Sequence, residues 1–388
     1  MAIGRLLIGT QANDTISGNS ANNFIDGHDG NDLLSGRSGN DTLDGGAGND
    51  TLDGGAGADH FIGGSGYDVV TYANAASGVS LDLLGLTGGA GDAQGDTFTQ
   101  VESVIGSDYG DTIRGGNSNN NLYGGDGDDI LFGRGGTNNL FGGEGVDRAQ
   151  YSDATAGVLA DLQDSSINTN DAAGDRYYSI ENLYGSSFND NLRGDAGNNV
   201  LSGLAGNDRL YGRDGNDTLL GGDGADSLYG GNGTDRAQYS DAAERVVVDL
   251  ANMASNQCDA AGDVFDSIEN LMGSKFNDGL WGDSGDNAFW GYDGNDILSG
   301  RGGNDTLNGG EGQDTFIFSK GFSSDRVTDF ENDVDTIRLL NFGVSTFTAA
   351  RALATETNGN VVFDFGNGDT LQIDNTTLAA LSNDVVFV

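Results

Sequence analysis

The sequence predicts an all-β protein, a parallel β-roll or β-helix solenoid, and three observations lead to this fold class. A nine-residue unit recurs along most of the chain, with glycine at places 1, 2 and 4, aspartate at place 6 and an apolar residue at place 8. Consecutive copies fill residues 45–71, which read GGAGNDTLD, GGAGADHFI and GGSGYDVVT. The chain also holds 68 glycines among 388 residues and no proline. A fixed short period is typical of solenoids, in which stacked units bury a shared core.

Counting units outward from that stretch divides the chain into four arrays, three spacers and two end segments. The arrays contain seven, five, six and five units, 23 in all, and each spacer has 34 residues. In order, we predict an N-terminal cap at 1–8, array 1 at 9–71, spacer 1 at 72–105, array 2 at 106–150, spacer 2 at 151–184, array 3 at 185–238, spacer 3 at 239–272, array 4 at 273–317 and a small β-rich C-terminal module at 318–388.

Within each unit we expect a turn followed by a very short strand. Glycine tolerates the positive φ values of a tight loop, so places 1 to 6 form the turn. Places 7 to 9 form the strand, with place 8 pointing inward against the strands stacked above and below it. If two units complete one turn of the solenoid, residues 18 apart lie one above the other. Asp32, Asp50 and Asp68 then share one edge, and Asp41 and Asp59 share the other.

The spacers resemble one another and predict inserts on the solenoid, not independent domains. Each has an alternating apolar segment, at 79–83, 158–162 and 246–250, followed by a polar loop, a Gly-Asp pair and two apolar residues three apart. This pattern predicts one short, half-buried strand followed by an irregular turn that leads into the next array.

The nine-residue period stops in the C-terminal module. Residues 316–318, 326–330 and 336–340 are expected to be strands, and residues 347–355 a short helix. Residues 361–365 and 370–373 flank the sequence GNGD, which predicts a hairpin. We expect this module to cover the end of the stack.

The charge of the chain limits its partners. Sixty acidic residues face 17 basic ones, a formal net charge of -43, so nucleic acid and anionic membrane surfaces are poor partners and no nucleic acid is expected to bind. Cys258 is the only cysteine, which excludes an intrachain disulfide framework and any multi-cysteine metal site. No stretch approaches the length of a transmembrane segment, and the apolar run near the start is too short for a secretory signal peptide.

The stacked carboxylates instead indicate bound cations. Aspartates this close repel one another unless a cation lies between them, and hard oxygen ligands in large number suit Ca²⁺ better than Mg²⁺. The alternative, an acidic solvated face without ions, does not explain the fixed phase of aspartate, glycine and apolar residue. Stacking allows about 10 to 15 Ca²⁺ ions, and fewer where asparagine replaces aspartate at place 6 (Asn23, Asn120, Asn138, Asn199 and Asn287), which we interpret as capping turns with weak metal binding or none. The candidate carboxylate ligands are Asp14, Asp32, Asp41, Asp50, Asp59, Asp68, Asp111, Asp129, Asp147, Asp190, Asp208, Asp217, Asp226, Asp235, Asp278, Asp296, Asp305 and Asp314.

With these motifs, residues 9–317 resemble the RTX (repeats-in-toxin) family of hemolysin-type calcium-binding repeats. The resemblance implies a β-roll, export through a type I secretion apparatus and folding on extracellular calcium. It also implies that glycines at places 2 and 4 supply carbonyl ligands, represented by Gly46, Gly48, Gly55, Gly57, Gly64, Gly66, Gly125, Gly127, Gly222 and Gly224. The segments DTFIF, RVTDF, DTIRL and DVVFV after residue 313 are similar to the secretion regions of such proteins. Many members carry an enzyme or toxin domain before the repeats, whereas here the repeats begin at Gly9.

Aromatic residues at place 9 form a second candidate site. They are Tyr123, Phe132, Phe141, Tyr211, Tyr229, Trp281 and Trp290. Residues two units apart share a face, so these rings could form exposed ladders that stack on sugars or pair with another roll. The alternative, which we favour, is that spacer strands pack over them.

The sequence therefore predicts a secreted, non-catalytic calcium-binding protein with a structural, surface-layer, matrix or adhesive role at the cell surface. Its expected partners are calcium, the type I secretion apparatus and either further copies of itself or a cell-surface polysaccharide. No catalytic residue is predicted, because neither a nucleophile motif nor a carboxylate pair stands apart from the repeat. The alternatives are a polysaccharide-binding module and, with the least support, a cytolysin or a hydrolase-associated RTX protein.

Overall fold

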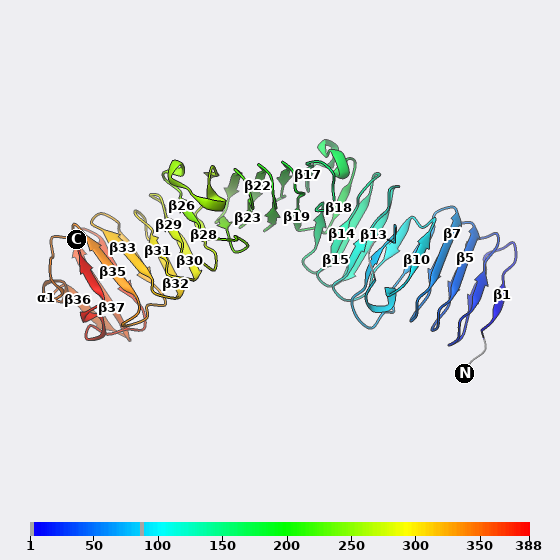
Figure 1. Cartoon of the computed structure of the whole chain (residues 1–388), viewed down its shortest axis with the longest axis horizontal. Coiled ribbons are helices and arrows are strands. Elements are labelled where there is room, and N and C mark those ends of the chain that lie inside the picture. Colours follow the sequence, from blue (N-terminus) through cyan, green and yellow to red (C-terminus); the bar gives the residue numbers. More distant parts are fainter. Residues whose placement is uncertain (1–3, 86–88) are drawn as a thin grey trace. The chain divides into compact units, whose positions relative to one another are not determined.

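The computed structural model describes residues 4–85 and 89–388, so the first three residues of the predicted N-terminal cap and residues 86–88 of spacer 1 lie outside it. The chain forms two compact units. Unit 1 comprises Met1–Ser187 and Leu192–Asp195, and unit 2 comprises Phe188–Asn191 and Ala196–Val388. In each unit, short parallel strands stack one above the other as the rungs of a solenoid (Figure 1). The predicted fold class is confirmed.

In unit 1, every nine-residue repeat of arrays 1 and 2 has a strand at places 7 to 9, and some of these strands continue into the next turn. The strands before spacer 1 are β1 Leu6–Ile8, β2 Thr15–Ser17, β3 Phe24–Asp26, β4 Leu33–Ser35, β5 Thr42–Ala47, β6 Thr51–Asp53, β7 His60–Ser65 and β8 Val69–Thr71. Those of array 2 are β12 Thr112–Arg114, β13 Asn121–Asp126, β14 Ile130–Phe132, β15 Asn139–Glu144 and β16 Arg148–Gln150. The predicted cap also contributes a rung, because β1 pairs with β3 in parallel.

Two nine-residue units complete one turn. Strand β5 pairs with β3 below and β7 above, and β6 pairs with β4 and β8, each with partners 18 residues apart. Place 8 forms the core between the two sheets, and Ile25, Leu34, Leu43 and Leu52 are fully buried. A strand of three residues that buries one side chain is stable only inside such a stack, because its neighbours supply both its backbone partners and its core contacts.

The spacers stay inside the stack, and here the sequence-based expectation of one strand is wrong: each spacer contributes three. In spacer 1 these are β9 Ser80–Asp82, β10 Thr97–Thr99 and β11 Ser103–Ile105, with a 3-10 turn η1 at Gly91–Ala93. In spacer 2 they are β17 Leu159–Asp161, β18 Arg176–Tyr178 and β19 Asn182–Tyr184, with η2 Ser165–Ile167 and η3 Asn170–Ala172. In spacer 3 they are β26 Val247–Asp249, β27 Val264–Asp266 and β28 Asn270–Met272, with η4 Met253–Ser255 and η5 Cys258–Ala260. Strands of three residues are too short to show a period of two in the sequence.

Each spacer forms one enlarged turn at which a sheet ends and another begins. In spacer 1, β10 pairs with β7 and is the last strand of that sheet, while β11 pairs with β8 and continues the other sheet into β13. Strand β9 begins a third sheet, which array 2 continues through β12. Spacer 3 repeats this arrangement, because β27 ends the sheet of β24, β28 continues from β25, and β26 starts a sheet that continues in β29.

Unit 2 contains the rest of array 3, spacer 3, array 4 and the C-terminal module; β20 Asn191–Arg193 is divided between the two units. Its array strands are β21 Val200–Ser202, β22 Arg209–Asp214, β23 Thr218–Leu220, β24 Ser227–Asn232, β25 Arg236–Gln238, β29 Gly279–Trp281, β30 Ala288–Asp293, β31 Ile297–Ser299, β32 Thr306–Glu311 and β33 Thr315–Ser319. They pair in parallel at a separation of 18 residues within the arrays, as in β22 with β24 and β30 with β32.

The C-terminal module extends both sheets of unit 2 and then closes one of them with antiparallel strands. Its elements are β34 Ser324–Val327, β35 Thr336–Leu340, α1 Phe347–Arg351, β36 Ala354–Thr357, β37 Asn360–Gly366, β38 Asp369–Ile373, η6 Ala380–Ser382 and β39 Val385–Phe387. The predicted hairpin is present, because β37 and β38 pair in antiparallel fashion. The predicted helix is shorter than expected, since it ends at Arg351 and strand β36 follows. No helix among the described residues is long and apolar enough to cross a membrane.

Candidate metal centre

Within each array, the place-6 aspartates form columns along the edges of the stacked turns. One carboxylate oxygen, Oδ1, accepts a hydrogen bond from the backbone N–H of place 6 one turn earlier. Asp32 accepts from Asp14 at 2.7 Å, Asp50 from Asp32 at 2.8 Å, and Asp68 from Asp50 at 2.9 Å. The same bond recurs in every array, so each aspartate is held in one orientation by the turn beneath it.

The other carboxylate oxygen, Oδ2, is buried in most of these aspartates and has no hydrogen-bond partner among the described residues. This holds for Asp32, Asp41, Asp50, Asp59, Asp68, Asp129, Asp147, Asp208, Asp226, Asp235, Asp296, Asp305 and Asp314. A buried carboxylate without a partner is costly unless a cation compensates its charge. Burial raises the pKa of Asp296 to about 8 and that of Asp208 and Asp314 to about 7, and nearby carboxylates add to the shift.

Each Oδ2 without a partner lies beside a place-1 glycine, in a hollow that any larger side chain at that place would fill. A Cβ on Gly45, at place 1, would lie closer than 3.0 Å to both the Oδ2 of Asp50 and the carbonyl oxygen of Gly63 one turn on. The hollows beside Gly27, Gly203 and other place-1 glycines are bounded in the same way. No three carboxylate, imidazole or thiolate groups converge among the described residues. The oxygens beside each place-1 glycine belong to a carboxylate and to a backbone carbonyl, and both are oxygen ligands that suit Ca²⁺.

The glycines predicted to supply carbonyls take up the positive φ expected of them. All ten lie in this region, from Gly55 at 79° to Gly57 at 156°. Their carbonyls point along the stack, since a Cβ on Gly64 or Gly66 would collide with the carbonyl oxygens of Gly46 or Gly48. The carbonyl oxygen beside Oδ2 belongs instead to the place-1 glycine one turn on. The sequence did not indicate this glycine as a ligand, because the turn alone explains a glycine at that place.

The first unit of an array satisfies its aspartate internally. The N–H groups of Thr10, Ser107 and Ser274, at place 2, donate to the Oδ2 of the aspartate of the same unit at 2.6, 2.6 and 2.5 Å, and the hydroxyls also donate to these carboxylates. These aspartates are Asp14, Asp111 and Asp278. Asp190, at the same place in array 3, is also buried, and its N–H donates to Asp208. The first aspartate of an array thus differs from the later ones because its Oδ2 already has a hydrogen-bond donor. In the sequence, serine or threonine at place 2 marks such an aspartate.

Asparagine at place 6 also donates hydrogen bonds to its neighbours. The Nδ2 of Asn23 donates to Asp41 at 2.9 Å, and that of Asn138 donates to Asp175 at 2.9 Å. The Nδ2 of Asn287 donates to the carbonyl of Glu269 at 2.8 Å. The amide groups of Asn23 and Asn138 therefore add a second hydrogen bond to the Oδ1 of the next carboxylate, while the Oδ2 of Asp41 keeps no partner among the described residues.

The spacers hold their buried carboxylates with groups of the protein itself. Arg134 forms two hydrogen bonds with Asp82, at 2.8 and 3.1 Å, and Arg301 forms two with Asp249, at 2.7 and 2.6 Å. The hydroxyl of Tyr72 donates to Asp96 at 2.6 Å, and spacers 2 and 3 repeat this bond. The sequence did not lead us to predict that these arginines pair with spacer aspartates, although arginine occupies place 2 of the fourth nine-residue unit in every array.

The predicted place-9 aromatic residues differ in their surroundings: four stack in pairs, two tryptophans are partly buried, and Phe132 is almost fully buried. Tyr123 and Phe141 stack with centroids 4.4 Å apart, and Tyr178 of spacer 2 continues the stack at 4.5 Å. Tyr211 and Tyr229 form a second stack at 4.6 Å. Trp281 and Trp290 are partly buried, whereas Phe132 is only 3% exposed and lies beneath the guanidinium of Arg114. In the first stack the spacer strand β18 extends the ladder instead of covering it.

A comparison with protein families matches the repeats. A profile of the RTX calcium-binding nonapeptide repeat, four copies long, matches residues 8–43, 35–70, 105–140, 114–149, 184–219, 211–237, 265–298 and 281–316. These matches together cover more than half of the chain and include parts of all four arrays.

Two further comparisons add little to this match. A search of curated proteins finds no match. Among solved structures, the crystal structure of the extracellular lipase LipA from Serratia marcescens is similar at 23% sequence identity and a TM-score of 0.24. The similarity covers 52% of this chain and 40% of that lipase, so this chain spans less than half of the lipase it matches.

Proposed function

The chain belongs to the family of RTX calcium-binding repeat proteins, and from this premise we propose that it is a secreted, non-catalytic protein that folds on meeting extracellular calcium. The observation that carries the proposal is the column of buried Oδ2 atoms that lack partners in the described part of the chain. Bound Ca²⁺ supplies the positive charge there, while the chain's own groups hold each carboxylate through Oδ1 and open the hollow beside place 1.

Magnitudes favour a fold that depends on calcium. Extracellular calcium modules bind with a Kd of about 10⁻⁴ to 10⁻³ M. At ten times Kd each site adds roughly 1.4 kcal/mol to stability. Ten such sites would add about 14 kcal/mol, comparable to the whole stability of a typical domain. At cytosolic calcium, the net charge of -43 would oppose compaction and keep the chain in a state suited to export.

For the biological role, we propose a structural, surface-layer, matrix or adhesive component. The support is the acidic character of the stack, since Ca²⁺ can bridge carboxylates of neighbouring copies as well as those within one chain. Light scattering with and without millimolar Ca²⁺ tests this role. We expect calcium-dependent particles larger than one chain, and a strict monomer in calcium would contradict self-assembly.

A second candidate function, binding of a polysaccharide, rests on the aromatic stacks. Tyr178 lies on the last strand of its sheet and is 44% exposed, so it forms the accessible end of the Tyr123–Phe141 stack. Sugars stack on rings of this kind. A glycan array that compares the wild-type protein with Tyr178→Ala and with the double variant Trp281→Ala, Trp290→Ala distinguishes the two functions. Binding that either variant abolishes favours the polysaccharide, and no glycan binding by the wild-type protein argues against it.

A further inference from the structure

At the end of arrays 1, 2 and 3, the last aspartate is followed by a spacer glutamate instead of another aspartate. The Oε2 of Glu102 accepts the backbone N–H of Asp68 at 2.9 Å. Glu181 accepts from Asp147 at 2.8 Å, and Glu269 accepts from Asp235 at 2.8 Å. Each glutamate therefore takes the position of the next place-6 aspartate. It lies nine residues before the first aspartate of the following array and has an apolar residue two positions later, but the segment lacks the glycines of the nine-residue unit.

The three last aspartates lack a partner in the same way as those inside the arrays. Asp68, Asp147 and Asp235 are all 0% exposed, and the Oδ2 of each is buried without a hydrogen bond to any residue that the structure describes. An ion on this oxygen would need further ligands from the spacer, because the array ends here.

The spacers supply a carbonyl at the required position. A Cβ on Gly63, the place-1 glycine of the last unit in array 1, would lie closer than 3.0 Å to both the Oδ2 of Asp68 and the carbonyl oxygen of Gln100. At Gly142 the corresponding carbonyl is that of Ser179, and at Gly230 it is that of Ser267. The hollow is therefore bounded by the same two kinds of oxygen as the hollows inside the arrays.

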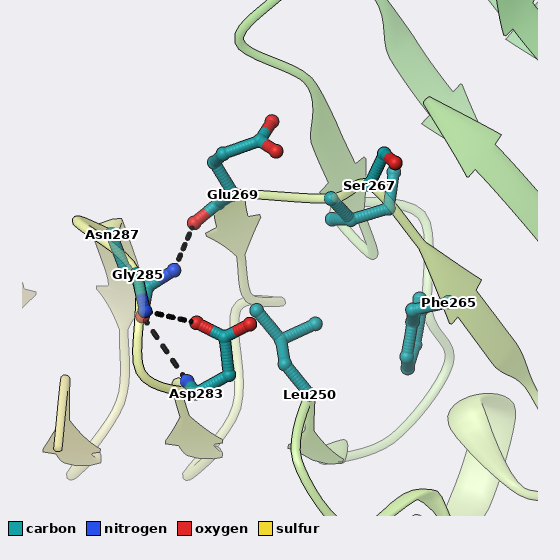
Figure 2. Close-up of a pocket in the computed structure, with 8 residues that line it drawn as sticks. Leu250, Phe265, Ser267, Glu269, Asp283, Gly285 and Asn287 are labelled. Atoms are coloured by element: carbon teal, nitrogen blue, oxygen red, sulfur yellow. Dashed lines mark hydrogen bonds between the residues drawn. The ribbon is translucent and has the colours of Figure 1, made fainter. Parts of the chain in front are cut away.

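The carbonyl is aimed by an unusual backbone conformation. Gln100, Ser179 and Ser267 have φ of 53°, 48° and 55°, a region that residues other than glycine rarely adopt. Such strain persists where the surrounding structure requires it, and it recurs here in all three spacers. In each case the glutamate follows two residues later. Figure 2 shows Ser267 and Glu269 on one segment of spacer 3, with the Glu269 carbonyl facing Asn287 and its carboxylate pointing the other way.

The opposite edge of the same turn is arranged differently. There the next carboxylate is Asp96, whose Oδ1 accepts the N–H of Asp59 at 2.6 Å. Its Oδ2 is already bonded by the hydroxyl of Tyr72. The atoms nearest the hollow beside Gly54 belong to Asp59 and to the ring of Phe61, with no carbonyl among them. On this edge of each spacer turn the spacer carboxylate is thus bonded by a tyrosine, although the Oδ2 of Asp59 itself has no partner among the described residues.

We propose that each spacer completes an additional calcium site, formed by the orphaned aspartate of the preceding array, the spacer carbonyl and the spacer glutamate. The three sites join Asp68 with Gln100 and Glu102, Asp147 with Ser179 and Glu181, and Asp235 with Ser267 and Glu269. This inference rests on calcium binding by the arrays, and it extends the row of candidate calcium sites across turns that lack the glycines of the repeat. An ion at these positions would fasten each enlarged turn to the array before it.

Native mass spectrometry of the full chain in saturating calcium tests the proposal. The triple variant Glu102→Gln, Glu181→Gln, Glu269→Gln keeps an acceptor for the backbone N–H but removes the charge, and we expect it to bind three fewer ions than the wild-type protein. The matched control is Asp96→Asn, Asp175→Asn, Asp263→Asn on the edge where tyrosines bond the spacer carboxylates, which we expect to bind the wild-type number.

An unchanged ion count in the glutamate variant would overturn the proposal, as would an equal loss in both variants. If the triple variant does not fold, the single variant Glu269→Gln provides the same test, with one ion lost as the supporting result and none as the contrary one. A wild-type protein that binds no calcium would instead refute calcium-dependent folding itself, so the two failures are distinguishable.

Discussion

The arrays and the spacers both bury carboxylates, but they satisfy them in different ways. In the arrays, one oxygen of most place-6 aspartates is bonded to the backbone and the other has no partner in the described part of the chain. In the spacers, Asp82 and Asp249 are paired with arginines, and Asp96 and its two counterparts are bonded by tyrosines. The arrays therefore leave carboxylate oxygens for a cation to bind, whereas most carboxylates of each spacer are bonded by the chain's own donors. Four predictions test this difference.

Removal of calcium should have the largest effect. With a chelator at neutral pH, we expect the strand signal in circular dichroism to collapse, because the uncompensated carboxylates in the arrays repel one another. If ten sites each contribute roughly 1.4 kcal/mol, the loss exceeds the stability of the remaining contacts. A full β spectrum in the chelator would contradict the dependence of the arrays on a cation.

Loss of the arginine in a spacer pair should destabilise even the calcium-loaded protein. Arg301→Ala leaves Asp249, which is 6% exposed, without its bidentate partner. Breaking a buried pair of this kind costs about 3 kcal/mol, which should appear as a lower unfolding temperature in saturating calcium. The double variant Arg301→Ala, Asp249→Ala is the control and should recover part of the loss. Equal unfolding temperatures for Arg301→Ala and the wild-type protein would show that the pair is dispensable.

A single aspartate inside an array should matter more than one at its start. Asp50→Asn removes a charge from a candidate site, and we expect a loss of about 1.4 kcal/mol at calcium ten times Kd. Asp14→Asn should cost much less, because Thr10 already bonds the Oδ2 of Asp14. Calcium titrations followed by circular dichroism compare the two variants. A higher calcium midpoint for Asp14→Asn than for Asp50→Asn would reverse the comparison.

Acid should partly replace calcium in the arrays. Burial raises the pKa of Asp296 to about 8 and of Asp129 and Asp226 to about 7, above the ordinary value of 3.8. Between these values the folded chain binds more protons than the unfolded chain, so without calcium its stability rises as the pH falls from about 8 towards 4. In a chelator, part of the strand signal should therefore return near pH 5. Strand signal that decreases with acidification from pH 7 to pH 5 would contradict this sign.

The repeat makes most of the fold predictable from the sequence. A unit with an apolar residue only at place 8 can bury it only by stacking, so the 18-residue offset between Asp32 and Asp50 follows from the period. The helix after Phe347 and the single strand expected in each spacer were less accurate, because these segments are too short to show a period. The arginines at place 2 were visible in the sequence, but their partners lie 52 residues away.

The sequence alone determined the class of the protein, the spacing of its aspartates and the identity of the cation, because these depend on a pattern that repeats within nine residues. Only the tertiary structure decided which aspartates have a hydrogen-bond donor of their own for Oδ2. Asp14 and Asp50 occupy the same place in the same motif, yet a neighbouring N–H completes one and leaves the other open. The spacer glutamates belong to the same category, since Glu102 accepts the N–H of Asp68 only when an enlarged turn places the two together. Thr10 and Asp14 are four residues apart and Asp68 and Glu102 are 34 apart, yet both hydrogen bonds depend on how the folded turns place the backbone beside the carboxylate.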